Sequence, residues 1–212
     1  MTTRSHLQIL AAPMLMIAAL SLLPGAAAAQ GGPDTASGPM QQAARLDRDG
    51  QTAQARAIYQ AVIDSANAAR ARALRGMAMS YAFDGDCANT VKYETMVAAY
   101  WATRESDDPQ NAFYQQGEMA NEAARVCLDT GDPDAAERWY RRGYELGTKE
   151  PAPLTHPRSL WEFRLAHALA RIAARRGDTA QARAQIAAAR RALDGDTAMA
   201  AQQERFFPYL VG

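Results

Sequence analysis

Four glycines, each followed by a polar residue, divide most of this chain into similar segments. The pattern is clearest at Gly131-Asp132, and it recurs at Gly177-Asp178, at Gly50-Gln51 and, in its loosest form, at Gly85-Asp86. Glycine relieves the strain of the left-handed conformation that ends many helices, and an aspartate side chain accepts hydrogen bonds from the free amides of the next helix. Pro133 suits the first position of a helix, where no amide proton is needed. The pattern therefore predicts helix-turn-helix hairpins in series.

The composition favours an all-helical domain. The chain has 212 residues, 48% of them hydrophobic and 22% charged, which is enough for one sizeable core. Alanine dominates, while runs of β-branched residues, which are typical of strands, are almost absent. The formal net charge is zero. A balanced charge gives no support for nucleic-acid binding, which needs a basic surplus.

The N-terminus has the features of a secretory signal peptide. Arg4 provides a basic start, an apolar stretch covers residues 7–23, and alanines precede expected cleavage near Ala28 or Ala29. The apolar stretch contains Pro13 and is shorter than the roughly 20 residues that a membrane-spanning helix needs. This favours cleavage over retention as a membrane anchor.

The predicted boundaries of the signal peptide, the leader and the folded domain follow from these features. Residues 1–29 are predicted to be the signal peptide, residues 30–38 a flexible leader, and residues 39–212 the folded domain. We therefore expect a periplasmic or secreted protein.

The spacing of the turns leads to a family resemblance. The turn glycines stand at positions 50, 85, 131 and 177, so that successive turns are 35, 46 and 46 residues apart. Small and apolar residues recur at fixed offsets before three of the turns: Leu74, Ala78 and Tyr81; Ala120, Ala124 and Cys127; and Ala166, Ala170 and Ala173. A period near 34 with two helices per unit is typical of tetratricopeptide repeats. Over residues 40–194 the chain resembles this family.

The resemblance implies an α-solenoid of about four units with a C-terminal capping helix. That helix is expected to begin after Asp196 and to run to about Phe207. Aromatic and apolar residues near the C-terminus either cover the last repeat or present a surface to a partner: Phe206, Phe207, Tyr209 and Leu210.

The chain departs from the family pattern at several places. Unit 2 has Glu94 where the other units carry Tyr or Ile, and unit 1 has Pro39 where an apolar residue is expected. The wider spacings lengthen the helices around residues 105–109 and produce a loop over residues 148–157.

Cys87 and Cys127 are the two cysteines of the chain. Cys87 begins the second helix of unit 2, and Cys127 lies near the end of the neighbouring first helix of unit 3. Stacked hairpins bring these positions to the same end of the array, and an exported protein meets an oxidising environment. A structural disulfide is favoured, and two buried thiols are the alternative.

Catalytic and metal-binding patterns are missing from the sequence. His156 and His167 do not form a metal-binding spacing, and no glycine-rich phosphate loop or nucleophile motif occurs. Glu118 and Glu122 lie one helical turn apart, which is more often a solvated face than a catalytic pair. We therefore expect no enzyme activity, no metal and no cofactor.

A groove formed by the first helices of the units is the remaining candidate for a functional site. In tetratricopeptide arrays, the first helices of successive units line a concave surface that binds peptides. Transfer of the family's groove positions gives a candidate set rich in arginine: Arg72, Arg75, Met79, Asn121, Arg125, Arg164, His167 and Arg171. Glu118 offsets part of this charge. Guanidinium groups suit carboxylates, and an asparagine can bind a peptide backbone.

Two functional hypotheses follow. The first is a module that binds an acidic segment or a C-terminal carboxylate of a protein in the cell envelope. The second is a scaffold that self-assembles through its convex helices or its aromatic C-terminus, which exposed Trp101 or Trp139 would favour. A solvated face in an arginine-rich protein would also account for the groove residues.

Overall fold

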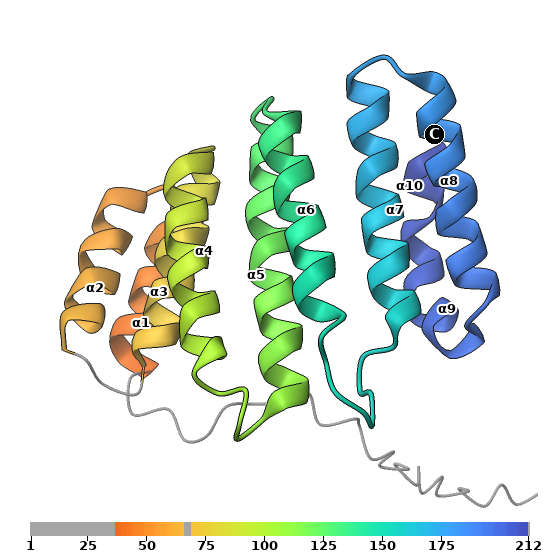
Figure 1. Cartoon of the computed structure of the whole chain (residues 1–212). Helices are drawn as coiled ribbons and strands as arrows, with labels where there is room; N and C mark the ends of the chain where they lie inside the picture. Colours follow the sequence, from red (N-terminus) through yellow and green to blue (C-terminus); the bar gives the residue numbers. More distant parts are fainter. Residues whose placement is uncertain (1–36, 66–68, 212) are drawn as a thin grey trace, which may run out of the picture. The chain divides into compact units, whose positions relative to one another are not determined.

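The computed structural model describes residues 37–65 and 69–211, so the predicted signal peptide and most of the predicted leader lie outside the described residues (Figure 1). Within these ranges the fold is all-α and contains no strand. The helices are α1 (Ser37–Arg48), α2 (Thr52–Asp64), α3 (Arg70–Phe83), α4 (Cys87–Ala102), α5 (Pro109–Asp129), α6 (Pro133–Gly147), α7 (Arg158–Arg175), α8 (Thr179–Asp194), α9 (Thr197–Gln203), the 3₁₀ helix η1 (Glu204–Phe206) and α10 (Pro208–Val211). None of these helices is both long and apolar enough to cross a membrane.

The first eight helices form four hairpins in series, which confirms the predicted fold class. In Figure 1 the pairs α1–α2, α3–α4, α5–α6 and α7–α8 follow one another in a row. Each helix packs against the next along the chain. We call α1, α3, α5 and α7 the first helices of the hairpins.

The four turns have the predicted glycine geometry. Gly50, Gly85, Gly131 and Gly177 have φ angles of 74°, 70°, 91° and 75°. After each glycine, the next backbone N–H donates to a carbonyl five residues back, as in the Asp132-to-Cys127 bond of 2.8 Å. This is the Schellman arrangement that satisfies the end of a helix. The sequence pattern therefore locates each reversal of the chain.

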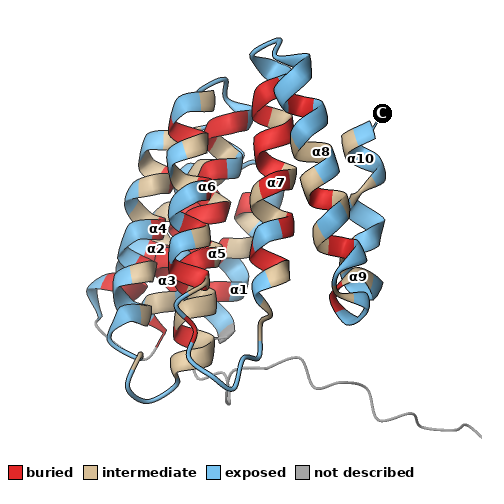
Figure 2. Ribbon diagram, turned by 45° about the vertical axis from the view of Figure 1, so that its right-hand side comes forward, coloured by how far each residue is buried: buried red, intermediate tan, exposed pale blue. Residues whose placement is uncertain are grey.

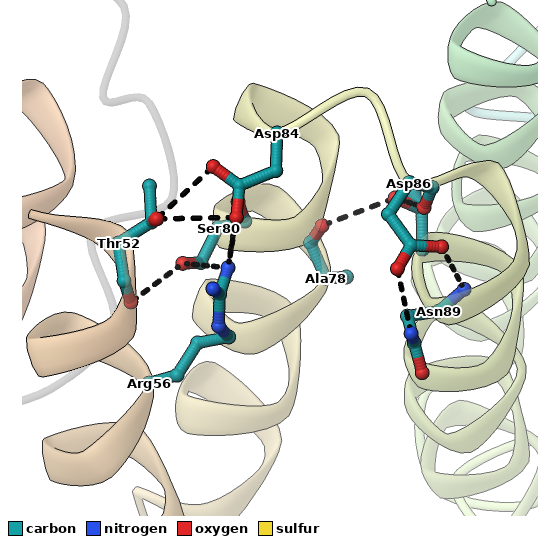
Figure 3. A network of polar contacts seen from close by, with 8 residues as sticks. Thr52, Arg56, Ala78, Ser80, Asp84, Asp86 and Asn89 are labelled. Carbon is teal, nitrogen blue, oxygen red and sulfur yellow. Dashed lines mark hydrogen bonds and ion pairs between the residues drawn. The ribbon is translucent and has the colours of Figure 1, made fainter. Parts of the chain in front are cut away.

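Aspartate side chains start the second helices of three hairpins. Asp86, Asp132 and Asp178 each accept a hydrogen bond from the backbone N–H three residues ahead, at 2.8 to 3.0 Å. Figure 3 shows this cap at Asp86, which also accepts from the side chain of Asn89 at 2.7 Å. Gln51 makes no such side-chain bond. The three aspartates thus satisfy amides that would otherwise lack partners.

A polar network joins the first two hairpins. Arg56 on α2 forms an ion pair with Asp84 at 2.7 Å, and the Thr52 hydroxyl donates to the same carboxylate at 3.0 Å (Figure 3). The buried Ser80 hydroxyl donates to the Thr52 carbonyl at 3.3 Å. This network connects the start of α2 to the end of α3.

The repeated small residues form the contacts between helices. Of the nine residues at the shared offsets, all except the partly buried Tyr81 are buried. Figure 2 shows the buried residues concentrated on the facing sides of the helices. The small side chain of alanine at these positions allows close approach of helix backbones.

Trp161 on α7 packs against glycines of the preceding hairpin. Its side chain is 1% exposed. A Cβ atom at Gly117 would lie 2.5 Å from the ring, and one at Gly147 would lie 2.1 Å from it. The absence of side chains at these glycines therefore makes room for the indole between the third and fourth hairpins.

The predicted disulfide is present. Cys87 at the start of α4 is bonded to Cys127 near the end of α5, with 4.8 Å between the Cα atoms and a sequence separation of 40. The bond links the second hairpin to the third. The alternative of two buried thiols is therefore wrong.

The ends of the domain differ from the prediction. The first helix begins at Ser37 and includes Pro39 in its first turn, so residues 37 and 38 do not belong to a flexible leader. Proline is tolerated there because the first amides of a helix have no partners within it. At the other end, α9 ends at Gln203 and not near Phe207. Pro208 lacks an N–H and starts the separate helix α10.

The C-terminal aromatic residues divide into two groups. Phe207 and Leu210 pack against the buried cluster of α7 and α8, as expected for a cover. Phe206 is 39% exposed and Tyr209 is 79% exposed, so these two do not bury their rings in the core. The predicted cover is therefore formed by only part of this segment.

Candidate functional site

Two hollows are lined mainly by the first helices of the hairpins. The N-terminal hollow has a volume of about 520 Å³ and is lined by Ala44, Asp47, Arg48, Tyr59, Arg72, Arg75, Gly76, Met79, Phe83 and Glu122. The C-terminal hollow has a volume of about 410 Å³ and is lined by Glu118, Asn121, Arg125, Tyr140, Phe163, Arg164, His167, Ala168, Arg171, Gln203 and Phe206. Helix α5 contributes residues to both. We call the two hollows together the groove.

All eight candidate groove residues line these hollows. Arg72, Arg75 and Met79 lie in the N-terminal hollow. The other five lie in the C-terminal hollow: Asn121, Arg125, Arg164, His167 and Arg171. The repeat offsets therefore gather residues that are far apart in sequence, although their binding role stays a prediction.

Acidic neighbours neutralise Arg75 in the N-terminal hollow. Arg75 makes two hydrogen bonds to the Glu122 carboxylate, one of them 3.3 Å long from Nε. Deeper in this hollow the Tyr59 hydroxyl donates to Asp47 at 3.0 Å. Burial, together with this carboxylate, raises the pKa of Tyr59. The charge of Arg75 in the N-terminal hollow is thus already balanced by Glu122.

Two arginines of the C-terminal hollow are also paired. Arg164 donates to Glu118, and Arg171 forms an ion pair with Asp129 at 3.2 Å. Burial raises the pKa of Glu118, while the Arg164 charge opposes that shift. These pairs hold the two guanidinium groups across the α5–α7 contact.

Arg125 is different from its neighbours. Its side chain is exposed, and no acidic residue among those described forms an ion pair with it. Tyr140 lines the same hollow. Arg125 therefore has a guanidinium group with remaining donors at the C-terminal hollow.

His167 lies on the same hollow with one ring nitrogen unused. Its Nε2 atom is buried without a hydrogen-bond partner in the described part of the chain, and Phe206 lines the same hollow. Burial, assisted by the nearby Arg171 charge, lowers the pKa of His167. The ring is thus held neutral near pH 7 and has capacity for one further hydrogen bond.

The expectation of a solvated face at Glu118 and Glu122 is wrong. Their side chains are only 20% and 16% exposed, and each is paired with an arginine of a neighbouring first helix. Helices α3 and α7 flank this face of α5 and remove much of it from water. These two acidic residues therefore neutralise part of the positive charge of the groove.

Several residues that line the groove were not predicted from the sequence. Arg48 precedes the first turn glycine by two residues, whereas the transferred groove positions lie six to thirteen residues before a turn. Gln203 and Phe206 reach the C-terminal hollow because the chain after α8 returns beside α7. Repeat offsets do not extend to this segment, so no sequence signal placed it there.

His156 has a structural role. Its Nδ1 lies 2.9 Å from the buried carboxylate of Glu150, and its ring stacks on Tyr114 at 3.9 Å between centroids. These contacts attach the predicted loop over residues 148–157 to α5. No group of three or more potential metal-binding side chains occurs in the described ranges.

Comparison with known proteins does not assign the chain to a family. No protein-family model matches the chain, and no curated protein sequence matches it.

Proposed function

We propose that this chain is an exported protein-interaction module and that its C-terminal hollow binds a carboxylate group of a partner protein in the cell envelope. The partner group is a C-terminal carboxylate or an acidic side chain in an extended segment. The proposal includes the tetratricopeptide-like interpretation of the hairpins, in which first helices present the binding surface. It also includes cleavage of the predicted signal peptide.

The free guanidinium of Arg125 carries this proposal. Arg75 and Arg164 already have carboxylate partners within the protein, whereas Arg125 has none among the described residues. A guanidinium group binds a carboxylate through two parallel hydrogen bonds, which adds geometric specificity to the charge attraction. A ligand carboxylate would give Arg125 an ion-pair partner, as Arg75 and Arg164 have within the protein.

Neighbouring groups support a carboxylate-bearing segment as the occupant. The buried Asn121 offers an amide for a peptide backbone, and His167 offers its unused ring nitrogen. Six arginines and three acidic residues line the two hollows as described, so the groove has an excess of positive charge. The disulfide is typical of proteins in oxidising compartments and supports export.

The test uses Arg125→Gln together with Arg171→Gln. Loss of the two charges is expected to weaken binding of the partner about a hundredfold, because each substitution removes a charge-assisted hydrogen bond. Arg138→Gln on α6 is the matched control, since Arg138 is exposed and lines neither hollow. Arg75 is left unchanged because its loss would leave Glu122 unpaired.

The measurement has two stages. Envelope proteins retained by the wild type and by Arg138→Gln, but lost by the double variant, are identified first. The implicated segment is then titrated as a synthetic peptide, in its free-acid and amidated forms when it is a C-terminus. Equal binding by a folded double variant, or by peptides with the carboxylate removed, would contradict the proposal.

The self-assembling scaffold remains a second candidate because of the C-terminal segment. Tyr209 and Val211 are 79% and 61% exposed. Trp101 and Trp139 are both partly buried, so they do not add to this argument. Sedimentation of the wild type and of Tyr209→Ser tests it: a dimer that becomes a monomer in the variant would support self-association through this segment.

A further inference from the structure

Glu94 occupies a position where two other units have a buried tyrosine and the last unit has the partly buried Ile186. It lies nine residues after its turn glycine, as do the buried Tyr59 and Tyr140. The Glu94 side chain is 1% exposed, and neither carboxyl oxygen has a hydrogen-bond partner in the part of the chain that the structure describes. A buried polar group without partners is costly and calls for an explanation.

A cavity adjoins this carboxyl group. It lies between α4, α5 and α6, has a volume of about 280 Å³, and is lined by Glu94, Thr95, Ala98, Ala99, Ala102, Gln116, Met119, Ala120, Trp139, Arg142 and Leu146. An apolar lining with few polar groups is typical of sites for small molecules. The four alanines create the space, and the Trp139 ring borders it.

Glu94 is the unused polar group of this cavity. The Gln116 amide nitrogen donates to Glu105 at 2.8 Å and to the Ala112 carbonyl at 3.3 Å. The Thr95 hydroxyl donates to the carbonyl of Val91 on its own helix at 2.7 Å. Arg142 is paired with Glu145 at 3.3 Å. A ligand entering the cavity therefore meets one polar group that lacks a partner.

The cavity is separate from the C-terminal hollow. On α5 it is lined by Gln116, Met119 and Ala120, whereas the C-terminal hollow is lined by Glu118, Asn121 and Arg125. At about 100° per residue, these two sets project from opposite sides of the helix. A ligand in the cavity and a peptide in the C-terminal hollow would thus contact different faces of α5.

The charges around Glu94 come from each helix packed against it. Glu122 on α5 is negative, while Arg75 on α3, Arg125 on α5 and Arg142 on α6 are positive. Burial, followed by the negative charge of Glu122, raises the pKa of Glu94 to about 9. The cavity therefore contains a neutral acid near pH 7, and a cation placed beside it would favour the ionised form.

We propose that this cavity binds a small primary ammonium ion, with its nitrogen against the Glu94 carboxylate and its alkyl chain among the alanines and Trp139. An ammonium group supplies the hydrogen-bond donors that the Glu94 oxygens lack. The aromatic face of Trp139 also attracts a cation. The proposal does not depend on peptide binding in the groove.

Binding is accompanied by release of a proton. The Glu94 carboxylic acid gives its proton to solvent, and the resulting carboxylate pairs with the ammonium ion that enters. No covalent bond forms with the ligand. Because one proton leaves, the affinity is expected to rise about tenfold for each pH unit between about pH 6 and pH 8.

The test is calorimetric titration of the folded chain with n-butylammonium, with n-butanol as the uncharged probe. Phosphate and HEPES buffers differ in ionisation enthalpy, so the heats measured in both report the number of protons released. The wild type is expected to bind one n-butylammonium with release of about one proton. It should bind n-butanol more weakly.

Two variants separate the roles of charge and space. Glu94→Gln preserves the shape of the side chain and is expected to reduce affinity for n-butylammonium ten- to a hundredfold and to abolish proton release. Ala99→Leu narrows the cavity at an exposed position and should weaken binding of both probes. Glu162→Gln, an exposed residue on α7, is the matched control and should bind like the wild type.

Three results would overturn the proposal: no heat of binding at millimolar n-butylammonium, equal affinity in Glu94→Gln, or equal affinity for n-butanol. The double variant Arg125→Gln/Arg171→Gln should still bind n-butylammonium. A failure of peptide binding in the groove would therefore not affect the interpretation of the n-butylammonium titration.

Discussion

Replacement of both cysteines by alanine is expected to lower the free energy of unfolding by roughly 4 kcal/mol. The disulfide closes a loop with a sequence separation of 40 residues between Cys87 and Cys127. In the chain-entropy model, loss of a cross-link over this distance increases the entropy of the unfolded chain by that amount. Equilibrium denaturation in urea, with and without a reductant, measures the change.

The reduced wild type is the control for lost packing. Cys127 is fully buried, so alanine also removes sulfur contacts. The reduced wild type keeps these contacts and should lose nearly the same free energy, whereas the alanine variant should not respond to the reductant. A difference below about 1 kcal/mol between the oxidised wild type and the alanine variant would contradict the cross-linking role.

The stability of the fold is expected to fall as the pH rises through neutrality because of Glu94. Its pKa is raised from 4.5 to about 9 in the folded protein. Between these values the folded state keeps a proton that the unfolded state releases. The free energy of unfolding therefore decreases by about 1.4 kcal/mol per pH unit, or about 3 kcal/mol from pH 6 to pH 8. The stabilisation is fully present below the unfolded-state pKa and is lost as the pH approaches about 9.

Glu94→Gln isolates this contribution. Glutamine preserves the size of the side chain and has no titratable proton. The difference in the free energy of unfolding between the two proteins should therefore change by about 3 kcal/mol from pH 6 to pH 8. Burial also raises the pKa of Glu118, but that group is present in both proteins and cancels in the comparison. Parallel pH profiles from urea denaturation would show that Glu94 ionises normally in the folded state.

Local sequence rules were sufficient for the hairpins and the disulfide. The positions of Gly85 and Gly131 fix where the chain reverses, because a left-handed turn needs glycine and the following aspartate starts the next helix. Once α4 and α5 are known to be neighbours, Cys87 and Cys127 fall at the same end of the pair. These predictions used only the order and spacing of residues.

Contacts between distant segments were not predictable from the same rules. The α9–α10 segment lines the C-terminal hollow through Gln203 and Phe206, because α9 ends at Gln203 and the chain that follows returns beside α7. The close contact of Trp161 with Gly117 and Gly147 depends on the relative positions of two hairpins. The spacing of residues within either hairpin does not determine the distance between the two hairpins.

The charge pattern of the groove was only partly predictable. Repeat offsets placed Arg75 and Arg125 in the hollows, yet they did not show that Glu122 pairs with Arg75 while Arg125 has no ion-pair partner among the described residues. Glu94 was recognised as a departure from the repeat, but its burial and the adjoining cavity depend on packing of three helices. Pairing and burial are properties of the assembled fold.

Site-specific photo-crosslinking is the most direct test of groove binding. A benzoylphenylalanine is introduced at Met79 or Phe206, which line the two hollows, and at Arg138 on α6 as the control. The account predicts that irradiation of intact cells yields adducts to one envelope protein from the groove positions and none from position 138. Adducts formed from position 138 alone would contradict it and would place the binding surface on the second helices of the hairpins.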